Sequence, residues 1–421
     1  MSVSAEPVRG EDPAPEREPL RHGDRATSGR LIDQAGEPRS ARIESLRALS
    51  VLGVVVMHAI YWAAESGVQT EFGPVDRVVA LAARPGPFLL FAGTGCMLYL
   101  PFARRYGGAA SIDLRRYALN RAVRILPLYY TALVAVLVFQ ERGGTVRDWL
   151  LYATFTQNLA IFPNDQLNRV LWYLVVEVQF YLALPLLAAV IAALARGSAR
   201  RAAAVLGVLG LASASFFGYA WHLDPTSDPA LRFSLPSMFL FFAGGMAVAM
   251  VQVSWAHRRP SWVRGPLAAA DTWLGAAVAL WVLSITVGGR AESPAATAIY
   301  LALSALLLAG CVLPLRPGLL VRALDWRPLA LVGVGSYSLY LWHDPILRAL
   351  AGVPWVPPGW VGLLAVGLPV SLLAAFVSYA VIEAPFLRLR RCWSRSSAVP
   401  DTGRVPDRPA DGPRASARRF R

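Results

Sequence analysis

Long apolar runs recur along most of this 421-residue chain and are separated by short polar connections. A helix needs about 20 apolar residues to cross the hydrocarbon core of a bilayer. Ten runs of that kind can be marked, and they cover roughly residues 43–64, 85–103, 122–140, 170–195, 202–221, 233–254, 268–288, 295–315, 328–349 and 359–383. The pattern predicts an all-α fold, a polytopic integral membrane bundle of about ten transmembrane helices.

The two ends of the chain have a different composition. Residues 1–41 and 389–421 are polar and mix Pro, Gly, Arg and acidic residues, which predicts disordered tails on either side of a transmembrane domain at 42–388. The three cysteines have no ligand-like spacing, so neither a metal site nor a disulfide framework is expected. The connection 141–169 is too polar for a span and is expected to be interfacial or re-entrant.

The charge of +14 raises the question of nucleic-acid binding, but its distribution argues against that class of partner. All 41 basic residues are Arg, and many lie in short connections between apolar runs. They concentrate in alternate connections, at 104–121, 196–201, 255–267 and 316–327. By the positive-inside rule this asymmetry predicts a multi-pass protein of the cytoplasmic membrane with both termini in the cytoplasm, which an even number of helices satisfies.

The first apolar run carries two ionisable residues, Arg47 and His58, that are eleven positions apart. At about 100° per residue, eleven steps return to within roughly 20° of the same helix face, about 16 Å further along the axis. Arg47 is therefore expected near the cytoplasmic surface and His58 deep in the bilayer. Because ionisable groups in hydrocarbon are costly, His58 is a predicted functional residue; the alternative is a hydrogen-bonded core histidine.

Further charges interrupt the third and fourth runs. Arg121 and Arg124 are three residues apart on one helix face, and they either anchor the helix at the inner surface or bind phosphates, which guanidinium groups grip well. Glu177 lies about two turns inside the fourth run, where an unpaired carboxylate would be costly. Since His58 reaches the same outer half, we expect the two to pair, either structurally or as an acid/base pair.

The ninth and tenth runs hold the remaining polar candidates. Ser336, Tyr340 and His343 fall on neighbouring turns of one helix face, and are interpreted either as a functional set or as an aromatic belt with a hydrogen-bonded histidine. Glu383, at the inner end of the last run, is close in sequence to Arg388 and is expected to form a structural ion pair.

These five elements, in this order, resemble the membrane acyltransferase-3 family. The family's hallmarks are Arg-x10-His in the first helix, Arg-x-x-Arg at the third, Trp-x4-Glu-x-x-Phe-Tyr, Ser-Tyr-x-x-Tyr-Leu-x-His, and Glu-x-Pro near the end. The matching residues here are Arg47 and His58, Arg121 and Arg124, Trp172 to Tyr181, Ser336 to His343, and Glu383 with Pro385. The resemblance covers about residues 42–388. This sequence departs from the family pattern at two places. Glu44-Ser45 stands where the family usually has an acidic-Gly pair, and residues 93–96 stand where it often has Ser-Gly-Phe.

The resemblance implies O-acylation of a sugar hydroxyl on a cell-surface glycan, a lipid-linked saccharide or a glycosylated natural product. The donor co-substrate would be a cytoplasmic acyl-CoA, commonly acetyl-CoA, with no permanently bound cofactor. Transfer from a thioester needs a base and a grip on a polyanionic donor. His58 is the candidate base or acyl carrier, with Glu177 orienting it. Arg47, Arg121 and Arg124 are the candidate ligands of the donor phosphates.

The acceptor end is assigned to Ser336, Tyr340 and His343. Two other classes of protein stay open from the residues alone. A proton-coupled sugar or lipid transporter would use the same buried His, Glu and Arg, although the runs show no symmetry between the two halves. A non-enzymatic membrane scaffold would leave a deep His and Glu unexplained.

Overall fold

The computed structural model describes residues 30–32, 38–105, 112–140, 144–161, 167–222, 229–287 and 293–389. Within these residues the chain is helical, apart from short connections and one small hairpin of β1 (Arg30–Ile32) and β2 (Pro38–Ser40), which pair antiparallel. The hairpin lies inside the segment expected to be a tail. The predicted disorder of residues 1–29 and 390–421 lies outside the described residues.

Nine helical segments of the described chain are long and apolar enough to cross a membrane. The prediction of an all-α polytopic bundle is therefore confirmed. The segments are α1 (Ala41–Glu65), α2 (Pro74–Ala83) with α3 (Gly86–Arg104), α4 (Leu114–Ala135) with a π-helical turn (Val136–Gln140), α6 (Leu171–Ala195), α7 (Ala199–His222), α9 (Leu235–His257), α10 (Ala270–Val287), α11 (Pro294–Val312) and α15 (Gly359–Ser378) with a π-helical turn (Tyr379–Glu383).

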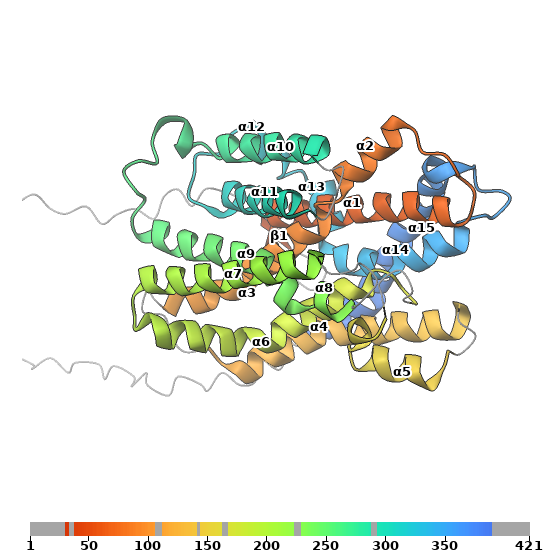
Figure 1. The fold of residues 1–421 in the computed structure, drawn as a ribbon, viewed down its shortest axis with the longest axis horizontal. Coiled ribbons are helices and arrows are strands. Elements are labelled where there is room, and N and C mark those ends of the chain that lie inside the picture. Colours follow the sequence, from red (N-terminus) through yellow and green to blue (C-terminus); the bar gives the residue numbers. More distant parts are fainter. Residues whose placement is uncertain are drawn as a thin grey trace, which may run out of the picture.

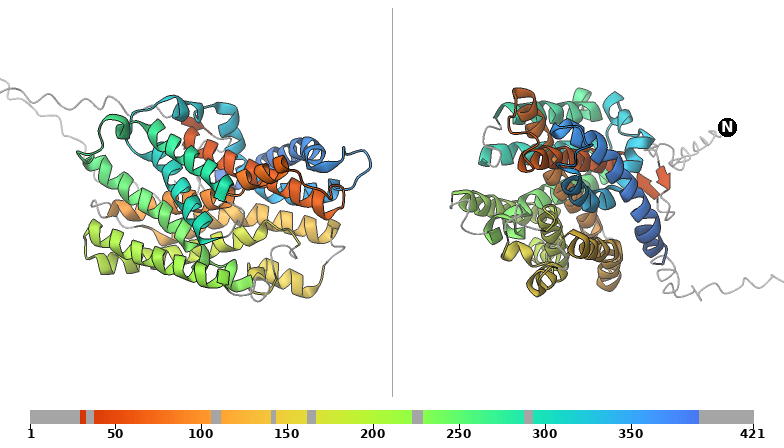
Figure 2. Two further views of the ribbon diagram at one scale, coloured as in Figure 1. Left: turned by 45° about the horizontal axis from the view of Figure 1, so that its top comes forward. Right: turned by 90° about the vertical axis from the view of Figure 1, so that its right-hand side faces the viewer.

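The long helices run side by side along the bundle (Figure 1). The end-on view in Figure 2 places α1 and the C-terminal helices in one part of the bundle and α4, α6 and α7 in the other. Short helices complete the described chain: α5 (Val146–Ala153), α8 (Pro229–Arg232), α12 (Leu319–Ala323), α13 (Arg327–Val334) and α14 (Ser336–Leu350), with 3₁₀ turns at Gln157–Leu159 and Gly265–Ala268.

The ninth apolar run, expected to be one helix over 328–349, is broken into α13 and α14 at Gly335. Two glycines in three residues, Gly333 and Gly335, weaken the helix at this point. Gly333 also has a packing role, because a Cβ at this position would lie 1.9 Å from the carbonyl oxygen of Glu44. The backbone of α13 therefore lies directly against α1, and α14 starts as a new helix inside the bundle.

Small residues also set the crossing of α3 and α9. A Cβ at Gly95 would lie 2.3 Å from the carbonyl oxygen of Phe242, and one at Gly245 would lie 1.8 Å from that of Ala92. Both helices approach to backbone contact, which holds α3 firmly in place. This contact matters for the site because α3 supplies one of its walls.

The described residues between α4 and α6, at 144–161 and 167–170, form α5 and a 3₁₀ turn. Neither is long enough to cross a membrane, in agreement with the sequence. Asn158, fully buried, donates hydrogen bonds of 2.8 Å to the carbonyl oxygens of Trp172 and Phe233. These bonds fasten the segment to the start of α6 and to the connection that precedes α9.

The glycine contact between α3 and α9 gives a stability test. Gly245→Ala should lower the midpoint of thermal unfolding in detergent, because the added methyl group meets backbone that cannot yield without separating the helices, at a cost of about 1–3 kcal/mol. Gly207→Ala in α7 is the matched control, since no atom lies within 4 Å of its Cβ position. Equal midpoints for the two variants would contradict this account of the crossing.

Candidate active site

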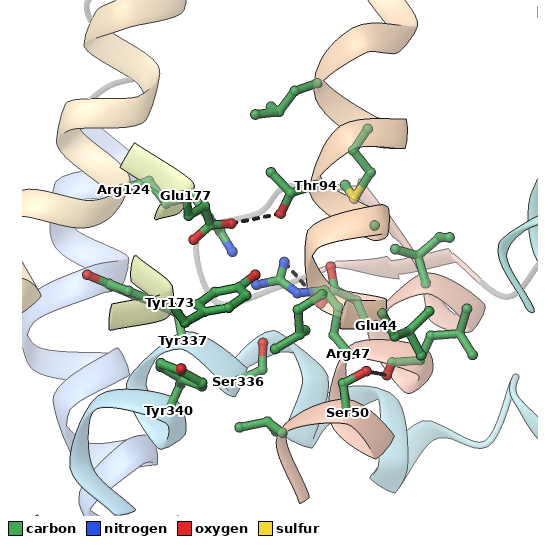
Figure 3. Close-up of a pocket in the computed structure, with 18 of the residues that line it drawn as sticks. Glu44, Arg47, Ser50, Thr94, Arg124, Tyr173, Glu177, Ser336, Tyr337 and Tyr340 are labelled. Atoms are coloured by element: carbon green, nitrogen blue, oxygen red, sulfur yellow. Dashed lines mark hydrogen bonds and ion pairs between the residues drawn. The ribbon is translucent and has the colours of Figure 1, made fainter. Parts of the chain in front are cut away.

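Six helices line a cavity of about 360 Å³. Its walls come from the first half of α1, the middle of α3, the N-terminal half of α4, the N-terminal half of α6 and the first turns of α14 (Figure 3). Leu308 of α11 completes the lining. Its polar and charged lining consists of Ser40, Glu44, Arg47, Ser50, Thr94, Arg121, Arg124, Tyr173, Glu177, Tyr181, Ser336, Tyr337 and Tyr340. Residues from distant parts of the chain, all but Ser40 in helices, thus meet in one polar space.

Three arginines give this cavity its positive character. Arg47 lies 3.8 Å from the carboxylate of Glu44, one turn earlier in α1, and is partly shielded by it. Arg121 and Arg124 are one turn apart on α4 and both line the cavity, as their spacing predicts. The Arg121 Nε atom is buried and has no hydrogen-bond partner in the part of the chain that the structure describes. The arrangement leaves a cationic surface with donors available to an anionic ligand.

Arg124 also forms an ion pair, at 3.9 Å, with the buried Glu383 that follows α15. The Glu383 carboxylate accepts a hydrogen bond of 3.3 Å from the Ser338 hydroxyl. The sequence predicted an ion pair for this carboxylate, but placed Arg388 beside it and did not anticipate Arg124. These two interactions link α4, α14 and the end of α15. They therefore fix the position of the Arg124 side chain along the bundle axis.

Glu177 lies in the cavity wall, but its partner is not the one expected from the sequence. Its carboxylate accepts a hydrogen bond of 2.7 Å from the Thr94 hydroxyl of α3, which Figure 3 shows across the cavity. The predicted pairing of His58 with Glu177 is wrong. The register of α6 explains this, because Tyr173 stacks on Phe91 with ring centroids 4.2 Å apart and so directs this face of α6 toward α3.

His58 pairs with His343 instead. His343 Nε2 lies 3.3 Å from His58 Nδ1, and the two ring centroids are 5.1 Å apart in an edge-to-face arrangement. His343 is completely buried, whereas His58 is half-buried. The pairing brings α1 and α14 together. Along each helix axis, the histidine lies about 10 Å beyond a serine that lines the cavity, Ser50 in α1 and Ser336 in α14.

The hydrogen-bond partners of the two rings identify which nitrogen of each histidine carries the proton. A carbonyl oxygen only accepts, so His343 Nδ1 donates to the Leu339 carbonyl at 3.1 Å and His58 Nδ1 donates to the Val54 carbonyl at 2.8 Å. His343 Nε2 then presents its lone pair to the His58 Nδ1 proton. His58 is therefore the tautomer with its proton on Nδ1 and its lone pair on Nε2. A general base needs such a free lone pair to accept a proton.

Tyr340 separates the cavity from the histidine pair. Its ring lines the cavity, packs 5.2 Å from Tyr173 and 5.8 Å from the His343 ring, and its hydroxyl donates to the Val170 carbonyl at 2.9 Å. Ser336 also faces the cavity (Figure 3). Of the three residues that sequence reasoning assigned to an acceptor end, two therefore share a cavity with the arginines, and His343 contacts His58.

On the side away from the cavity, a charged network supports the histidine pair. The buried carboxylate of Asp344 accepts hydrogen bonds from the Trp62 indole at 2.8 Å and from the Arg169 amide at 3.0 Å. The Arg169 guanidinium lies 3.9 Å from the Tyr61 ring centroid and 4.2 Å from that of Trp62, and it pairs with Glu65. The network fixes α14 against the C-terminal end of α1.

Sequence reasoning missed Thr94, Asp344 and Arg169. Asp344 and Arg169 had a usable signal, because each is a charge at the edge of an apolar run that is expected to find a partner. Thr94 had none, since a threonine is common in such helices. Among the described residues, no group of three or more His, Cys, Asp and Glu side chains could hold a metal ion.

The Asp344 network gives a second stability test. Trp62→Phe keeps an aromatic ring but removes the indole donor, which leaves one oxygen of a buried carboxylate unpaired at a cost of about 1–3 kcal/mol. The midpoint of thermal unfolding should fall accordingly. Trp355→Phe is the control, because Trp355 is exposed in a connection. A midpoint unchanged by Trp62→Phe would show that the carboxylate has another source of hydrogen bonds.

Comparison with known proteins identifies relatives that match most of this chain. The chain is 26% identical over 366 residues to "Putative peptidoglycan O-acetyltransferase YrhL" of Bacillus subtilis, covering 82% of this chain and 54% of that protein. It is 27% identical over 342 residues to nodulation protein 10 of Rhizobium leguminosarum, covering 74% and 84% respectively. It is 23% identical over 366 residues to peptidoglycan O-acetyltransferase OatA of Listeria monocytogenes, covering 82% and 55%.

The chain thus spans about half the length of two of these three relatives. No solved structure matches it. The profile of the acyltransferase-3 family, described as an acyltransferase domain, matches residues 40–380, which include every cavity arginine, Glu177 and both paired histidines. This chain belongs to the membrane acyltransferase-3 family.

Proposed function

We propose that this protein is a membrane O-acyltransferase that moves an acyl group, most simply acetyl, from acyl-CoA to a sugar hydroxyl of a cell-surface glycan. The observation that carries the proposal is the position of His58. Its free Nε2 lies between a cationic cavity and a polar network at the other end of α1. A base there can serve a donor from one side and an acceptor from the other.

The donor is proposed to occupy the cavity. Coenzyme A carries several phosphates, and Arg47, Arg121 and Arg124 offer guanidinium groups of the kind that bind phosphate oxygens. Two of the helices that line the cavity, α1 and α4, begin after Arg-containing polar segments, and the positive-inside rule assigns those segments, together with both termini, to the cytoplasm. Acyl-CoA is a cytoplasmic metabolite, so this orientation suits it.

The chemistry follows from the tautomers. His58 Nε2 takes the proton of the acceptor hydroxyl as its oxygen attacks the thioester carbonyl carbon. His343 Nε2, facing His58 Nδ1–H, stabilises the imidazolium that forms, the role that the sequence assigned to Glu177. The carbon–sulfur bond then breaks, an ester forms, and the proton leaves with the thiol of coenzyme A. Atoms and charge balance with no further reactant.

The acceptor is proposed to approach from the opposite end. Two of the relatives are named as peptidoglycan O-acetyltransferases, which favours a glycan. Trp62 and Tyr61 lie at the outer end of α1, one turn beyond His58. Aromatic side chains with a polar edge suit a sugar at a membrane interface. The transporter hypothesis predicts uptake driven by a proton gradient and no acyl transfer, so one assay separates the two functions.

A double-mutant cycle tests the histidine pair. His58→Ala should lower the rate of transfer from radiolabelled acetyl-CoA at least about 10²-fold, the usual contribution of a general base. His343→Ala should have a smaller effect alone and almost none in the His58→Ala background, because residues that act as a unit are not additive. Size-exclusion profiles confirm that each variant is folded.

The same cycle with Glu177 is the control. Glu177→Gln should combine additively with His58→Ala, since the structure joins Glu177 to Thr94 and not to His58. Strong coupling between His58 and Glu177, with none between the histidines, would contradict the assignment of His343. Full transfer activity in His58→Ala would refute the catalytic role of His58 itself.

The donor site has its own test. Arg121→Ala combined with Arg124→Ala should raise KM for acetyl-CoA about tenfold or more and leave KM for the acceptor unchanged, because each lost charge-assisted hydrogen bond costs about 1.5–3 kcal/mol. Arg200→Ala, exposed at the start of α7, is the matched control. A change confined to acceptor KM would place the acceptor in the cavity instead.

A further inference from the structure

The first turn of α14 opens directly into the cavity. The first hydrogen bond of this helix runs from the Leu339 amide to the Gly335 carbonyl, at 2.9 Å. The amides of residues 336–338 therefore have no partner within the helix. Free N–H groups at membrane depth are costly, and broken helices are tolerated there only where their ends are buried in protein or line a cavity. The break at Gly335 thus places the start of α14, with Ser336 and Tyr337, and the positive end of a helix dipole at the cavity wall.

The Ser336 hydroxyl points to a ligand at this helix end. It is 3% exposed and faces the cavity (Figure 3). Among the described residues it has no hydrogen-bond partner. The other hydroxyls of the first turns are all used: Tyr337 donates to the Ile125 carbonyl, Ser338 to Glu383, and Tyr340 to the Val170 carbonyl. A buried hydroxyl without a partner is costly, so the unpaired Ser336 Oγ indicates an absent acceptor.

The groups around Ser336 favour an anion. The cavity is lined by Arg47, Arg121 and Arg124 against Glu44 and Glu177. Glu383, outside the lining, offsets the charge of Arg124, so the positive end of the α14 dipole adds to an otherwise balanced set of charges. Figure 3 shows the Ser336 side chain and the Arg47 guanidinium entering the same part of the cavity. Discontinuous membrane helices direct their N-termini at anionic substrate groups for the same reason.

We propose that the N-terminus of α14, with the Ser336 hydroxyl, binds a phosphate group of the acyl donor. This proposal rests on the proposed function, since it takes the donor to be acyl-CoA. Phosphate oxygens would accept hydrogen bonds from the amides of residues 336–338 and from Ser336 Oγ, while the arginines neutralise the remaining charge. Ser336 is then a donor-binding residue, and not part of an acceptor site as the sequence predicted.

The position of this site agrees with the chemistry. Ser336 and His343 are seven residues apart on one helix, about 10 Å along its axis. An acyl-CoA held by its phosphates at the first turn of α14 needs its pantetheine arm to span that distance, past Tyr340, to bring the thioester to the histidine pair. The single helix α14 would therefore set both the anchor point of the donor and the place of reaction.

Coenzyme A binding to the purified full chain in detergent tests the proposal. Ser336→Ala should weaken binding roughly tenfold, the effect of losing one hydrogen bond to a charged group, and Ser336→Thr should restore most of it. Ser304→Ala in α11 is the matched control, because Ser304 Oγ is also buried and unpartnered but does not line the cavity. Its coenzyme A affinity should equal that of the unmodified protein.

Ser336→Asp separates a binding role from a structural one. Its carboxylate would occupy the anion site, so coenzyme A affinity should fall further than in Ser336→Ala, while the midpoint of thermal unfolding without ligand should not fall. Coenzyme A affinities that remain normal in Ser336→Ala and Ser336→Asp would overturn the phosphate site and leave the proposed function standing.

Binding of inorganic pyrophosphate distinguishes a failure of the phosphate site from a failure of the proposed acyl-CoA donor. If coenzyme A does not bind, but pyrophosphate raises the unfolding midpoint in a manner that Ser336→Asp abolishes, the anion site stands and acyl-CoA is not the donor. If neither compound binds the unmodified protein, the phosphate site is refuted.

Discussion

The backbone of α13 lies directly against that of α1 where Gly333 meets the carbonyl oxygen of Glu44, and the geometry of the site depends on this contact. It ends α13 inside the bundle and starts α14 two residues later. From that start, one helical repeat places Ser336 at the cavity, Tyr340 in its wall and His343 beside His58. Any larger residue at 333 would move all three together.

The second constraint is the cost of burying polar groups where water is absent. Asp344, 1% exposed, obtains an indole and an amide as donors, and the buried Glu383 obtains Arg124 and Ser338. These pairs connect helices that are distant in sequence and make the bundle rigid around the cavity. Partners are missing at the cavity itself, where Ser336 Oγ and Arg121 Nε point to a ligand.

Under the proposed function, one base between donor and acceptor would allow transfer of the acyl group across a bilayer. The donor and acceptor need not share a compartment if the reacting atoms meet at one point between them. The cationic cavity at one end of α1 and the aromatic network at the other are consistent with such a division. The half-buried His58 lies between these two regions, and its ring is held by the backbone of its own helix and by His343.

The sequence alone determined what depends on composition and helical period. Runs of about 20 apolar residues require membrane helices, and the spacing of Arg121 and Arg124 requires a shared face. It could not determine which buried charges meet, because that depends on the rotation and depth of helices packed by contacts far apart in the chain. Only the tertiary structure decided that His58 meets His343 and not Glu177, since the stacking of Tyr173 on α3 turns Glu177 to Thr94, while the break before α14 brings His343 to α1.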